Sequence, residues 1–531
     1  MMGKNKIKRR DILKGIVSLP FLGALGWAAG RDYKIYNDSK KGKIDFLNKL
    51  DIDITLPEEL QGTGPEKLSL GIVGIGIRGT QLLQALGFMH PDEMKDWEQN
   101  QPQRLQAFLE QEDMNVRITG VCDLFKHRTD LAVESTSRNG HQPKVFNTYK
   151  ELCESPEIDA VVIATTDLWH VPIALAALKS GKHVYIEKPL THKLSEVYKL
   201  RQAVQESGKV LQLGHHQRQN QSFVTAQDIV NKGVLGHINL VETSTNRNDD
   251  NGAWQYNMYE EFPDEMIDWD QYINGYYDIP FNREYFFRWR KYWKFGSGLT
   301  GDLLSHAYDS INCILNMGIP KYMVASGGIY THRDGRVVPD VLQATMEFPD
   351  YIRKFSQEKG KEKGMTLLYT ASLGNQFNRN TKFMGHDGTM ELGGDIYIYP
   401  DAQSTQYKEY LENNSIQPEE PIFYFDPSSQ SQIDIVTSAT TKYFADKGLL
   451  MDFRNGRAVD VTHMHIKEWI NSIRTGRKPS CSIDEGFEEA ITCIMATLAT
   501  KTGRRVEWDH ENEEMAIEGM RNPDFDELLV I

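Results

Sequence analysis

The feature that most constrains this chain is a glycine-rich turn after a short, largely apolar run. Residues 68–73 form the run, and glycines follow at 74, 76 and 79 in the spacing G-x-G-x-x-G. Because glycine has no Cβ, such a turn lets the backbone approach a pyrophosphate, and the next helix offers free N–H groups to the phosphates. Glycine-rich turns also join ordinary strands and helices, but this placement predicts a dinucleotide site. The residues predicted to form it are Gly74, Gly76, Ile77, Arg78 and Gly79.

An acidic residue follows the next predicted strand. Residues 116–122 are largely apolar and end at Asp123. An acid at this position of a dinucleotide fold accepts hydrogen bonds from the ribose hydroxyls, which favours NAD over NADP. Arg128 and its neighbour His127 lie close enough in sequence to leave NADP open. Residues 88–115, rich in Gln, Glu and Asp, are predicted to be a surface insertion.

Two further predicted strands end in polar residues. Residues 160–164 lead into a loop over 165–170, after which Pro172 is expected to open a helix, and residues 183–186 lead into Glu187-Lys188-Pro189. Strands alternating with helices predict an α/β fold with a doubly wound parallel sheet. The loops at the carboxyl ends of such strands form the ligand crevice. The further residues that we expect at the cofactor are Asp123, Thr165, His170, Glu187 and Lys188.

Composition excludes several classes of protein. The 531 residues carry a formal net charge of -14, and such an acidic balance argues against a general nucleic-acid binder. The five cysteines are far apart and include no C-x-x-C pair, so neither a zinc site nor a disulfide framework is indicated. His215 and His216 are adjacent, but without further ligands they predict no metal site.

The N-terminus has the pattern of an export signal. Arg9 and Arg10 stand in a basic stretch, and residues 16–29 are apolar with small side chains. This pattern resembles a bacterial twin-arginine signal, which exports folded proteins to the periplasm and suits an enzyme carrying a tightly bound cofactor. A basic amphipathic N-terminus is the alternative. We expect residues 1–33 to be the signal, which would anchor the protein to the membrane if it stayed uncleaved, and residues 34–64 to be a linker.

Together, these motifs resemble the Gfo/Idh/MocA oxidoreductases. The resemblance rests on the glycine turn, Asp123, the loop after residue 164 and above all Glu187-Lys188-Pro189. It implies an N-terminal Rossmann domain over residues 65–213 and a C-terminal α/β domain with a large open mixed sheet over 214–505, through which the chain would form a homo-oligomer. It also implies a cis bond before Pro189 and a position for Lys188 near the nicotinamide and the substrate oxygen. The acidic residues 506–531 are expected to be a loosely attached tail.

The second domain carries a possible acid–base pair. Asp302 and His306 stand four residues apart at the start of a predicted helix, so they share one face. The resemblance places a catalytic Asp-x-x-x-His pair here, beside Lys188. Histidine exchanges protons near neutral pH, and a neighbouring carboxylate would orient it. Alternatively, Asp302 caps the helix and His306 is a packed polar residue.

Aromatic residues are dense before this helix. Residues 253–295 include six Trp or Tyr side chains of interest and the run Arg288-Trp-Arg-Lys-Tyr-Trp293. Aromatic faces stack on sugar rings and Arg reaches their hydroxyls, so a carbohydrate-like ligand is indicated, although core packing explains such aromatics equally well. The residues that we expect at the substrate are His216, Arg218, Arg290 and Asp309.

These expectations describe an NAD(P)-dependent oxidoreductase acting on the CH–OH group of a sugar, cyclitol or glycoside. One alternative is a glycoside hydrolase that oxidises a ring hydroxyl, eliminates the aglycone and reduces the sugar again. Residues 301–306 lack the asparagine and the Tyr-Pro-Thr-His run expected of the best-known branch of such hydrolases. The second alternative is a non-catalytic sugar sensor, which would have no need for Lys188, Asp302 and His306 together.

Overall fold

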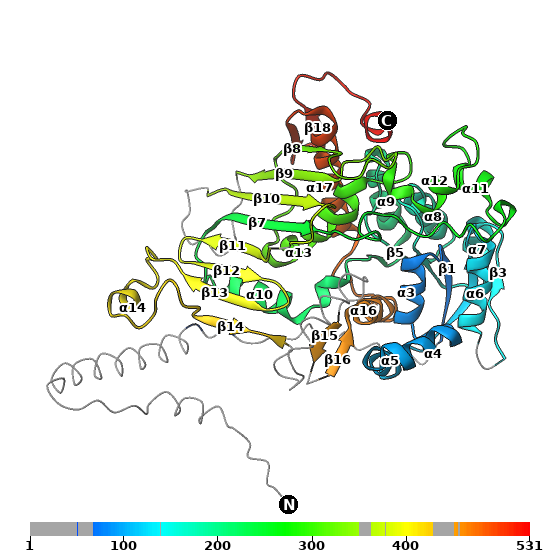
Figure 1. The fold of residues 1–531 in the computed structure, drawn as a ribbon, viewed down its shortest axis with the longest axis horizontal. Helices are drawn as coiled ribbons and strands as arrows, with labels where there is room; N and C mark the ends of the chain where they lie inside the picture. The colour runs from blue at the N-terminus through cyan, green and yellow to red at the C-terminus, as the bar shows by residue number, and fades with distance from the viewer. Residues whose placement is uncertain are drawn as a thin grey trace, which may run out of the picture.

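The computed structural model of the chain contains two large sheets, of six and ten strands, and a separate two-stranded hairpin (Figure 1). It describes Leu50, Ile52 and residues 67–137, 140–349, 363–377, 379–427, 451–454 and 457–531. The predicted export signal lies outside these residues, as does nearly all of the predicted linker. Within the described part of the chain, no helix is both long and apolar enough to span a bilayer.

The first sheet is parallel and has six strands in the order β3-β2-β1-β4-β5-β6. Its strands are short and largely buried, as expected of a parallel sheet covered on both faces. Ala160 and Val162 belong to one apolar cluster with helix α3, while Val161 and Ile163 belong to another with helix α8. The doubly wound fold is therefore confirmed. The strands are β1 (Leu68–Val73), β2 (Val116–Cys122), β3 (Lys144–Val145), β4 (Ala160–Ile163), β5 (His183–Ile186) and β6 (Leu211–Leu213).

The helices of this domain include one that begins earlier than the sequence predicts. Helix α8 begins at Asp167, so Pro172 lies inside it and most of the predicted loop over 165–170 is helical. Pro172 is the sixth residue of this helix, beyond the first turn, so its missing N–H leaves the Leu168 carbonyl without the usual helical donor. The helices are α3 (Ile77–Ala85), α4 (Pro91–Asn100), α5 (Pro102–Leu109), α6 (Lys126–Thr136), α7 (Tyr149–Glu154), α8 (Asp167–Lys179) and α9 (Leu194–Ser207).

The predicted insertion over 88–115 forms the helix pair α4 and α5, which has a small apolar cluster of its own. Trp97 packs edge-on against Phe108, and the Arg104 guanidinium lies 3.7 Å from the centre of the Trp97 ring. The helix pair therefore has an apolar contact of its own, while Phe88 and Met114 at the two ends of the segment join the core of the first domain.

The second sheet has ten strands in the order β14-β13-β12-β11-β7-β10-β9-β8-β17-β18. It is mixed, because β7 pairs parallel with β10 and antiparallel with β11, which confirms the expected open mixed sheet. Its strands are β7 (Ile238–Asn246), β8 (Tyr322–Gly328), β9 (Val341–Phe348), β10 (Met365–Ser372), β11 (Thr381–Gly385), β12 (Gly388–Leu392), β13 (Ile396–Pro400), β14 (Phe423–Phe425), β17 (Val506–Asp509) and β18 (Glu514–Ile517). A separate hairpin joins β15 (Met451–Arg454) to β16 (Arg457–Asp460).

Helices fill the space between the two sheets. The 20-residue helix α17 (Ile483–Thr502) begins with a capping box at Ser482 and is buried along most of its length. Helix α16 (Val461–Thr475) crosses back to the first domain, where Trp469 joins the apolar cluster of β1 and α3. The remaining helices and helical turns are η1 (His216–Gln219), α10 (Gln221–Asn231), η2 (Asp264–Met266), α11 (Trp269–Ile273), α12 (Arg283–Phe287), η3 (Trp289–Lys291), η4 (Thr300–Leu304), α13 (Ser305–Leu315) and α14 (Lys408–Glu412).

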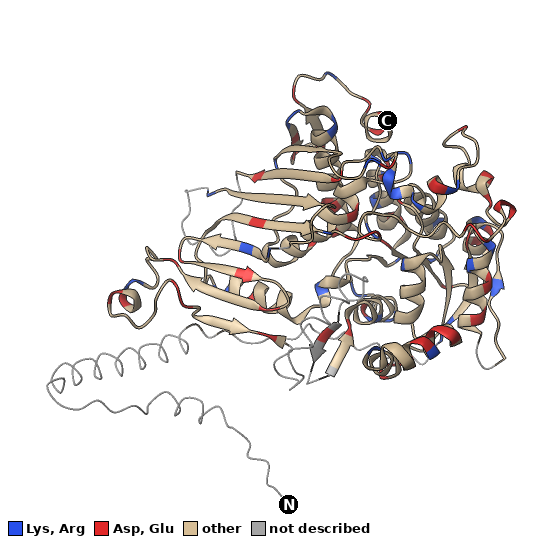
Figure 2. Cartoon of the chain, viewed as in Figure 1, with Lys and Arg blue, Asp and Glu red and all other residues tan. Residues whose placement is uncertain are grey.

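The predicted loose tail over 506–531 is part of the fold, so that expectation is wrong. Strand β17 pairs with β8 and β18, and helix α18 (Phe525–Val530) buries Leu529. Trp508 and Ile517 are buried among acidic neighbours, and these alternating apolar residues hold the segment in the sheet. Figure 2 shows acidic and basic residues mixed along the ribbons of both domains in this view.

Candidate active site

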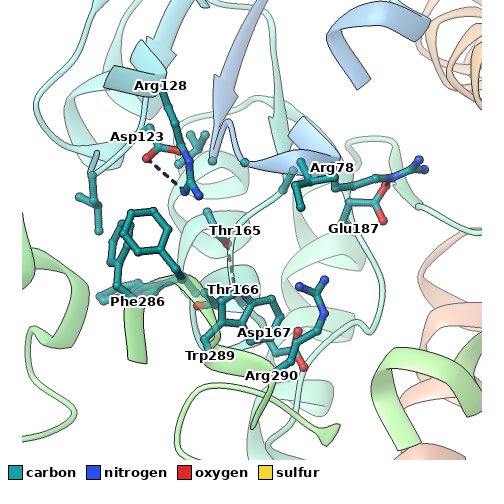
Figure 3. Close-up of a pocket in the computed structure, with 18 of the residues that line it drawn as sticks. Arg78, Asp123, Arg128, Thr165, Thr166, Asp167, Glu187, Phe286, Trp289 and Arg290 are labelled. Carbon is teal, nitrogen blue, oxygen red and sulfur yellow. Dashed lines mark hydrogen bonds and ion pairs between the residues drawn. The ribbon is translucent and has the colours of Figure 1, made fainter. Parts of the chain in front are cut away.

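A deep cleft lies between the two domains and has a cavity volume of about 610 Å³. It is lined by the glycine turn, the ends of β2, β4 and β5, and residues of the second domain that include Arg247, Tyr256, Trp289, Arg290 and His306. Figure 3 shows Arg78 and Glu187 on one side of this cleft and Trp289 and Arg290 on another. The carboxyl ends of the parallel strands therefore converge on one site, as expected.

The glycine turn is tightly packed at its first and third glycines. Gly74 has a φ of +86°, a conformation that side chains disfavour, and a Cβ on Gly79 would lie 2.2 Å from the carbonyl oxygen of Gly74. At Gly76 a Cβ would meet nothing closer than the Arg128 guanidinium, at 3.7 Å. Gly79 therefore brings the helix close to the strand, while Gly76 leaves the surface of the turn open.

The start of helix α3 suits a dinucleotide pyrophosphate. No side chain caps its N-terminus at Gly76, so its first-turn N–H groups are free to bind phosphate oxygens, and Ile77 and Arg78 line the cleft. Asp123 secures the turn, because its carboxylate accepts hydrogen bonds from Ile75 N at 2.6 Å and Phe125 N at 2.8 Å. The residues at this end of the cleft fit the cofactor that the motif predicts.

Arg78 links the glycine turn to two other predicted site residues. Its Nε donates to Glu187 Oε1 at 2.7 Å, and its Nη2 lies 3.2 Å from His216 Nδ1. Burial lowers the pKa of Arg78, but Glu187, Tyr185 and Asp460 together raise it by more, so the net shift is upward. Burial and the Arg78 charge both lower the pKa of His216 well below its ordinary value. The ion pair thus fixes Glu187 and leaves His216 neutral at the cleft wall.

Lys188 projects from the end of β5 across to the second domain. Its Nζ donates to the Asp302 carbonyl oxygen at 2.8 Å and to Asp302 Oδ1 at 3.2 Å. The bond between Lys188 and Pro189 is cis, as the family resemblance implies. Only 10% of the Lys188 side chain is exposed, so its ammonium is held at a fixed point in the cleft.

Asp302 is surrounded by hydrogen-bond donors and cations. Besides Lys188, Arg290 Nε lies 3.1 Å from Oδ1, Trp254 Nε1 donates to Oδ2 at 2.9 Å, and Arg247 Nη1 lies 3.8 Å from Oδ2. Burial raises the pKa of Asp302, but the charges of Lys188, Arg290 and Arg247 together lower it by more, so the pKa lies well below its ordinary value. The carboxylate is therefore ionised and positions these cations. It does not cap a helix, because it lies within the π-helical turn η4 and no side chain caps that turn.

His306 faces the cleft from helix α13, close to two other histidines. The centre of its ring lies 5.7 Å from that of His215 and 6.1 Å from that of His216. Burial lowers the pKa of His306 well below its ordinary value, and the Lys188 charge acts in the same direction. Its Nδ1 is buried without a hydrogen-bond partner among the described residues. His306 is therefore a neutral imidazole whose Nδ1 is available to a ligand in the cleft, and its surroundings disfavour the protonated form.

Three residues predicted at ligands lie behind the cleft wall. His170 is buried in α8, and its Nδ1 lies 2.7 Å from the Pro189 carbonyl oxygen. Arg218 and Asp309 form a buried ion pair, with Nη2 and Oδ1 2.6 Å apart. None of the three lines the cleft. His170 lies within helix α8, which begins earlier than predicted, and it is buried there. Arg218 and Asp309 point into the core, where each neutralises the charge of the other. His216, Arg290 and Thr165 do line the cleft.

Sequence reasoning missed several residues of the site. Arg247 follows directly after β7, and Trp254 holds a left-handed backbone conformation, with φ +65°, that places its indole against Asp302. Asp167, at the start of α8, accepts hydrogen bonds from Ser297 N at 2.9 Å and Ser297 Oγ at 2.6 Å. A polar residue at a strand end was a usable signal for Arg247. Among the described residues, no cluster of His, Cys, Asp and Glu has the arrangement of a metal site.

Comparison with known proteins identifies relatives of both domains. An uncharacterized oxidoreductase of Escherichia coli K12 is 28% identical over 205 residues, which cover 39% of this chain and 49% of that protein. Inositol 2-dehydrogenase of Salmonella typhimurium is 26% identical over 175 residues, covering 33% of this chain and 44% of that protein. The matches thus span less than half of each relative.

A solved structure shares the fold. The WlbA dehydrogenase of Bordetella pertussis, determined in complex with NADH and UDP-GlcNAcA, aligns with a TM-score of 0.54 at 15% identity, covering 84% of this chain and 99% of that one. Residues 68–215 match the model of an oxidoreductase family with an NAD-binding Rossmann fold, and residues 227–508 match the C-terminal α/β domain of the same family. With both domains matched and the cleft between them carrying the glycine turn and Lys188, this chain belongs to the Gfo/Idh/MocA oxidoreductase family.

Proposed function

We propose that this protein is a dinucleotide-dependent oxidoreductase that acts on a secondary alcohol of a sugar, cyclitol or glycoside. The observation that carries the proposal is that an imidazole and an ammonium group lie in the same cleft as the glycine turn. A neutral imidazole, His306, and a fixed ammonium, Lys188, both line that cleft. An alcohol oxidation needs such a pair, because the hydroxyl gives up a proton as its carbon loses a hydride.

The chain's own residues serve three roles in this reaction. When bound, the nicotinamide supplies the hydride acceptor or donor. His306 takes the hydroxyl proton during oxidation and returns it during reduction. Lys188 stabilises the negative charge that develops on the substrate oxygen. Asp302 keeps the Lys188 ammonium in place through its carbonyl and carboxylate oxygens. That Asp302 also orients the His306 ring is part of this proposal.

The cofactor that we propose is NAD, held tightly. Asp123 stands at the end of β2, where its charge would repel a ribose phosphate. Arg128 is the residue that would favour NADP, since its Nη1 lies only 3.8 Å from Asp123 Oδ1 and the side chain lines the cleft. Titration of the purified protein with both cofactors, followed by fluorescence, would decide between them. Tighter binding of NADP would overturn this assignment.

One experiment tests the reaction and the hydrolytic alternative together. Purified protein would be incubated, without added dinucleotide, with nitrophenyl glycosides and free sugars while nitrophenolate and reduced nicotinamide are followed by absorbance. Turnover of a sugar that requires added NAD or an acceptor sugar would support the oxidoreductase. Catalytic nitrophenolate release without net reduction would instead establish the glycoside hydrolase with a resident cofactor. Binding without turnover of any kind would identify a sugar sensor.

We also propose that the protein is exported through the twin-arginine route to the periplasm. The proposal rests on Arg9, Arg10 and the apolar residues after them. Replacing both arginines with lysine should leave the protein in the cytoplasm, as fractionation would measure.

We propose that copies of the chain associate through the broad C-terminal sheet. Light scattering of the purified protein would test this. A monomer would contradict it.

A further inference from the structure

One acidic side chain in the cleft faces three cations. Lys188 and Arg290 share Oδ1 of Asp302, while Arg247 approaches Oδ2 at 3.8 Å and Trp254 donates to that oxygen at 2.9 Å. A carboxylate has roughly four lone-pair sites, and Lys188, Arg290 and Trp254 already use three of them. Asp302 therefore cannot accept hydrogen bonds from all the N–H groups of the two arginines, because these outnumber its remaining lone-pair sites.

The other acids around this end of the cleft are already engaged. Glu187 pairs with Arg78 at 2.7 Å, and Asp167 Oδ2 accepts both hydrogen bonds from Ser297. Asp249 is exposed, and its Oδ1 accepts from Gly252 N at 2.8 Å. Solvent screens this last charge more strongly than the buried ones. Asp167 keeps its charge and attracts Arg290 and Lys188. Two largely buried carboxylates, Asp302 and Asp167, thus face the three cations Lys188, Arg247 and Arg290, and positive charge is left in excess.

The two guanidinium groups are held in position with N–H donors that Asp302 does not use. Arg290 lies 4.2 Å from the centre of the Trp289 ring, and Figure 3 shows the two side chains next to each other at the cleft. Such stacking fixes the plane of a guanidinium. Arg247 begins the loop after β7, where its backbone N–H donates to the Ser372 carbonyl at 2.8 Å, and its side chain is 36% exposed. The ion pair of its guanidinium with Asp302, at 3.8 Å, is a long one.

We infer that the substrate carries a carboxylate and that Arg247 and Arg290 bind it. A planar guanidinium fork matches a carboxylate, which is why arginine serves in this role more than lysine does. This inference rests on the proposed function, since it names the class of sugar whose alcohol reaches His306 and Lys188. The substrate is a sugar acid, with its carboxylate at the two arginines and its reacting hydroxyl at the imidazole.

The test compares neutral and acidic members of matched pairs. The cofactor-loaded protein would be titrated by calorimetry with glucose and glucuronate, then with galactose and galacturonate, and kcat/KM would be measured for each. We expect the acid of at least one pair to bind tenfold or more tightly than its neutral partner, about the contribution of one charge-assisted hydrogen-bonded pair. Raising the salt concentration should weaken only the acid. Equal affinities within both pairs would overturn the inference.

Variants assign the effect to the two arginines. Arg290→Gln and Arg247→Gln should each weaken binding of the acid about 10- to 100-fold, a larger loss than for the neutral sugar, and leave cofactor affinity unchanged. Arg290→Lys keeps the charge and loses the fork, so it should fall between the wild type and the Gln variant. Arg505→Gln, at the exposed ion pair with Glu347 on the far sheet edge, is the control and should change nothing. Equal losses for acid and neutral sugars would contradict the assignment.

The outcomes separate this inference from the proposed function. If an acid binds through Arg247 and Arg290 but reduces no NAD, the oxidoreductase assignment fails and the carboxylate site stands. If neutral sugars are oxidised and acids bind no better, the carboxylate inference fails and the oxidoreductase stands. Glucose 6-phosphate is the third arm of the titration. Its tighter binding than glucuronate would replace the carboxylate with a phosphate and overturn the sugar-acid class.

Discussion

The two walls of the cleft are built from different kinds of atoms. The first, which we call the cofactor wall, presents main-chain N–H groups and glycines of one short stretch, residues 74–79, together with Asp123. The second, which we call the substrate wall, presents polar and charged side chains from segments up to about sixty residues apart. It consists of Arg247, Arg290 and His306, with Asp302 supporting the arginines. The cofactor wall therefore depends on backbone shape, and the substrate wall depends on the placement of charge. Variants can separate these dependences.

The largest effect is expected at the substrate wall. His306→Ala and Lys188→Ala should each lower kcat by about two to four orders of magnitude, because they remove the proton acceptor or the charge that stabilises the substrate oxygen. Both variants should still bind the cofactor, as fluorescence titration would measure, since the glycine turn is intact in each. Unchanged turnover in either variant, with the fold intact by circular dichroism, would show that the walls have been assigned wrongly.

A second change tests the boundary between the substrate wall and the core. Arg218→Met leaves the Asp309 charge buried without its partner, and such a loss costs about 3–5 kcal/mol of unfolding free energy. Urea unfolding would measure this loss, and the Arg290→Gln variant, at a half-exposed position, should lose far less. If Arg218→Met kept its stability and only raised KM for the substrate, Arg218 would belong to the substrate wall after all.

Two glycines of the cofactor wall form a matched pair. In Gly79→Ala the new methyl group would overlap the Gly74 carbonyl oxygen, so we expect a lower melting temperature even without cofactor. In Gly76→Ala the methyl group meets only the Arg128 side chain at 3.7 Å, so the protein should keep its stability and lose cofactor affinity. Thermal melts with and without NAD would measure both effects. Similar behaviour of the two variants would argue that the turn does not approach a pyrophosphate.

The last prediction concerns pH and depends on two buried histidines that belong to neither wall. Burial lowers the pKa of His192 to about 3 and that of His215 to about 4 in the folded protein, below the ordinary value of about 6.5. The unfolded chain therefore binds protons first, and stability should be full above pH 6.5 and fall as the pH drops toward 4. The unfolding free energy measured across this range should decline less in His192→Leu. The exposed His510→Gln is the control, and a curve that stays flat for the wild type would contradict the prediction.

The same contrast explains what could be predicted from the sequence. The cofactor wall follows from neighbouring residues, since the strands, the glycine turn and Asp123 depend on local spacing and on the rule that parallel strands end at one edge. Lys188 was found because its motif is contiguous. Strand β2 was placed at its observed bounds for the same reason.

The substrate wall depends on contacts between distant segments, which no local pattern reveals. Asp302 was expected to orient His306, but its oxygens bind Lys188, Arg290 and Trp254, and the last of these lies 48 residues earlier in the chain. Arg218 and Asp309 were assigned to the substrate because a buried ion pair and a ligand-binding pair have the same residue types. The segment after residue 505 was predicted to be a loosely attached tail because its overall composition is acidic. Its apolar residues alternate with the acidic ones, and this alternation is what joins β17 and β18 to the sheet.

The position of β7 in the middle of the large sheet has a consequence for how such an enzyme acquires new substrates. Hydrogen bonds to β10 on one side and β11 on the other fix this strand, yet the loop that begins at Arg247 leaves the sheet directly over the cleft. Insertions or exchanges within that loop would leave the strand pairing and the cofactor domain untouched. The loop is therefore a natural site for evolution, or for an engineer, to graft a new specificity onto an unchanged redox scaffold.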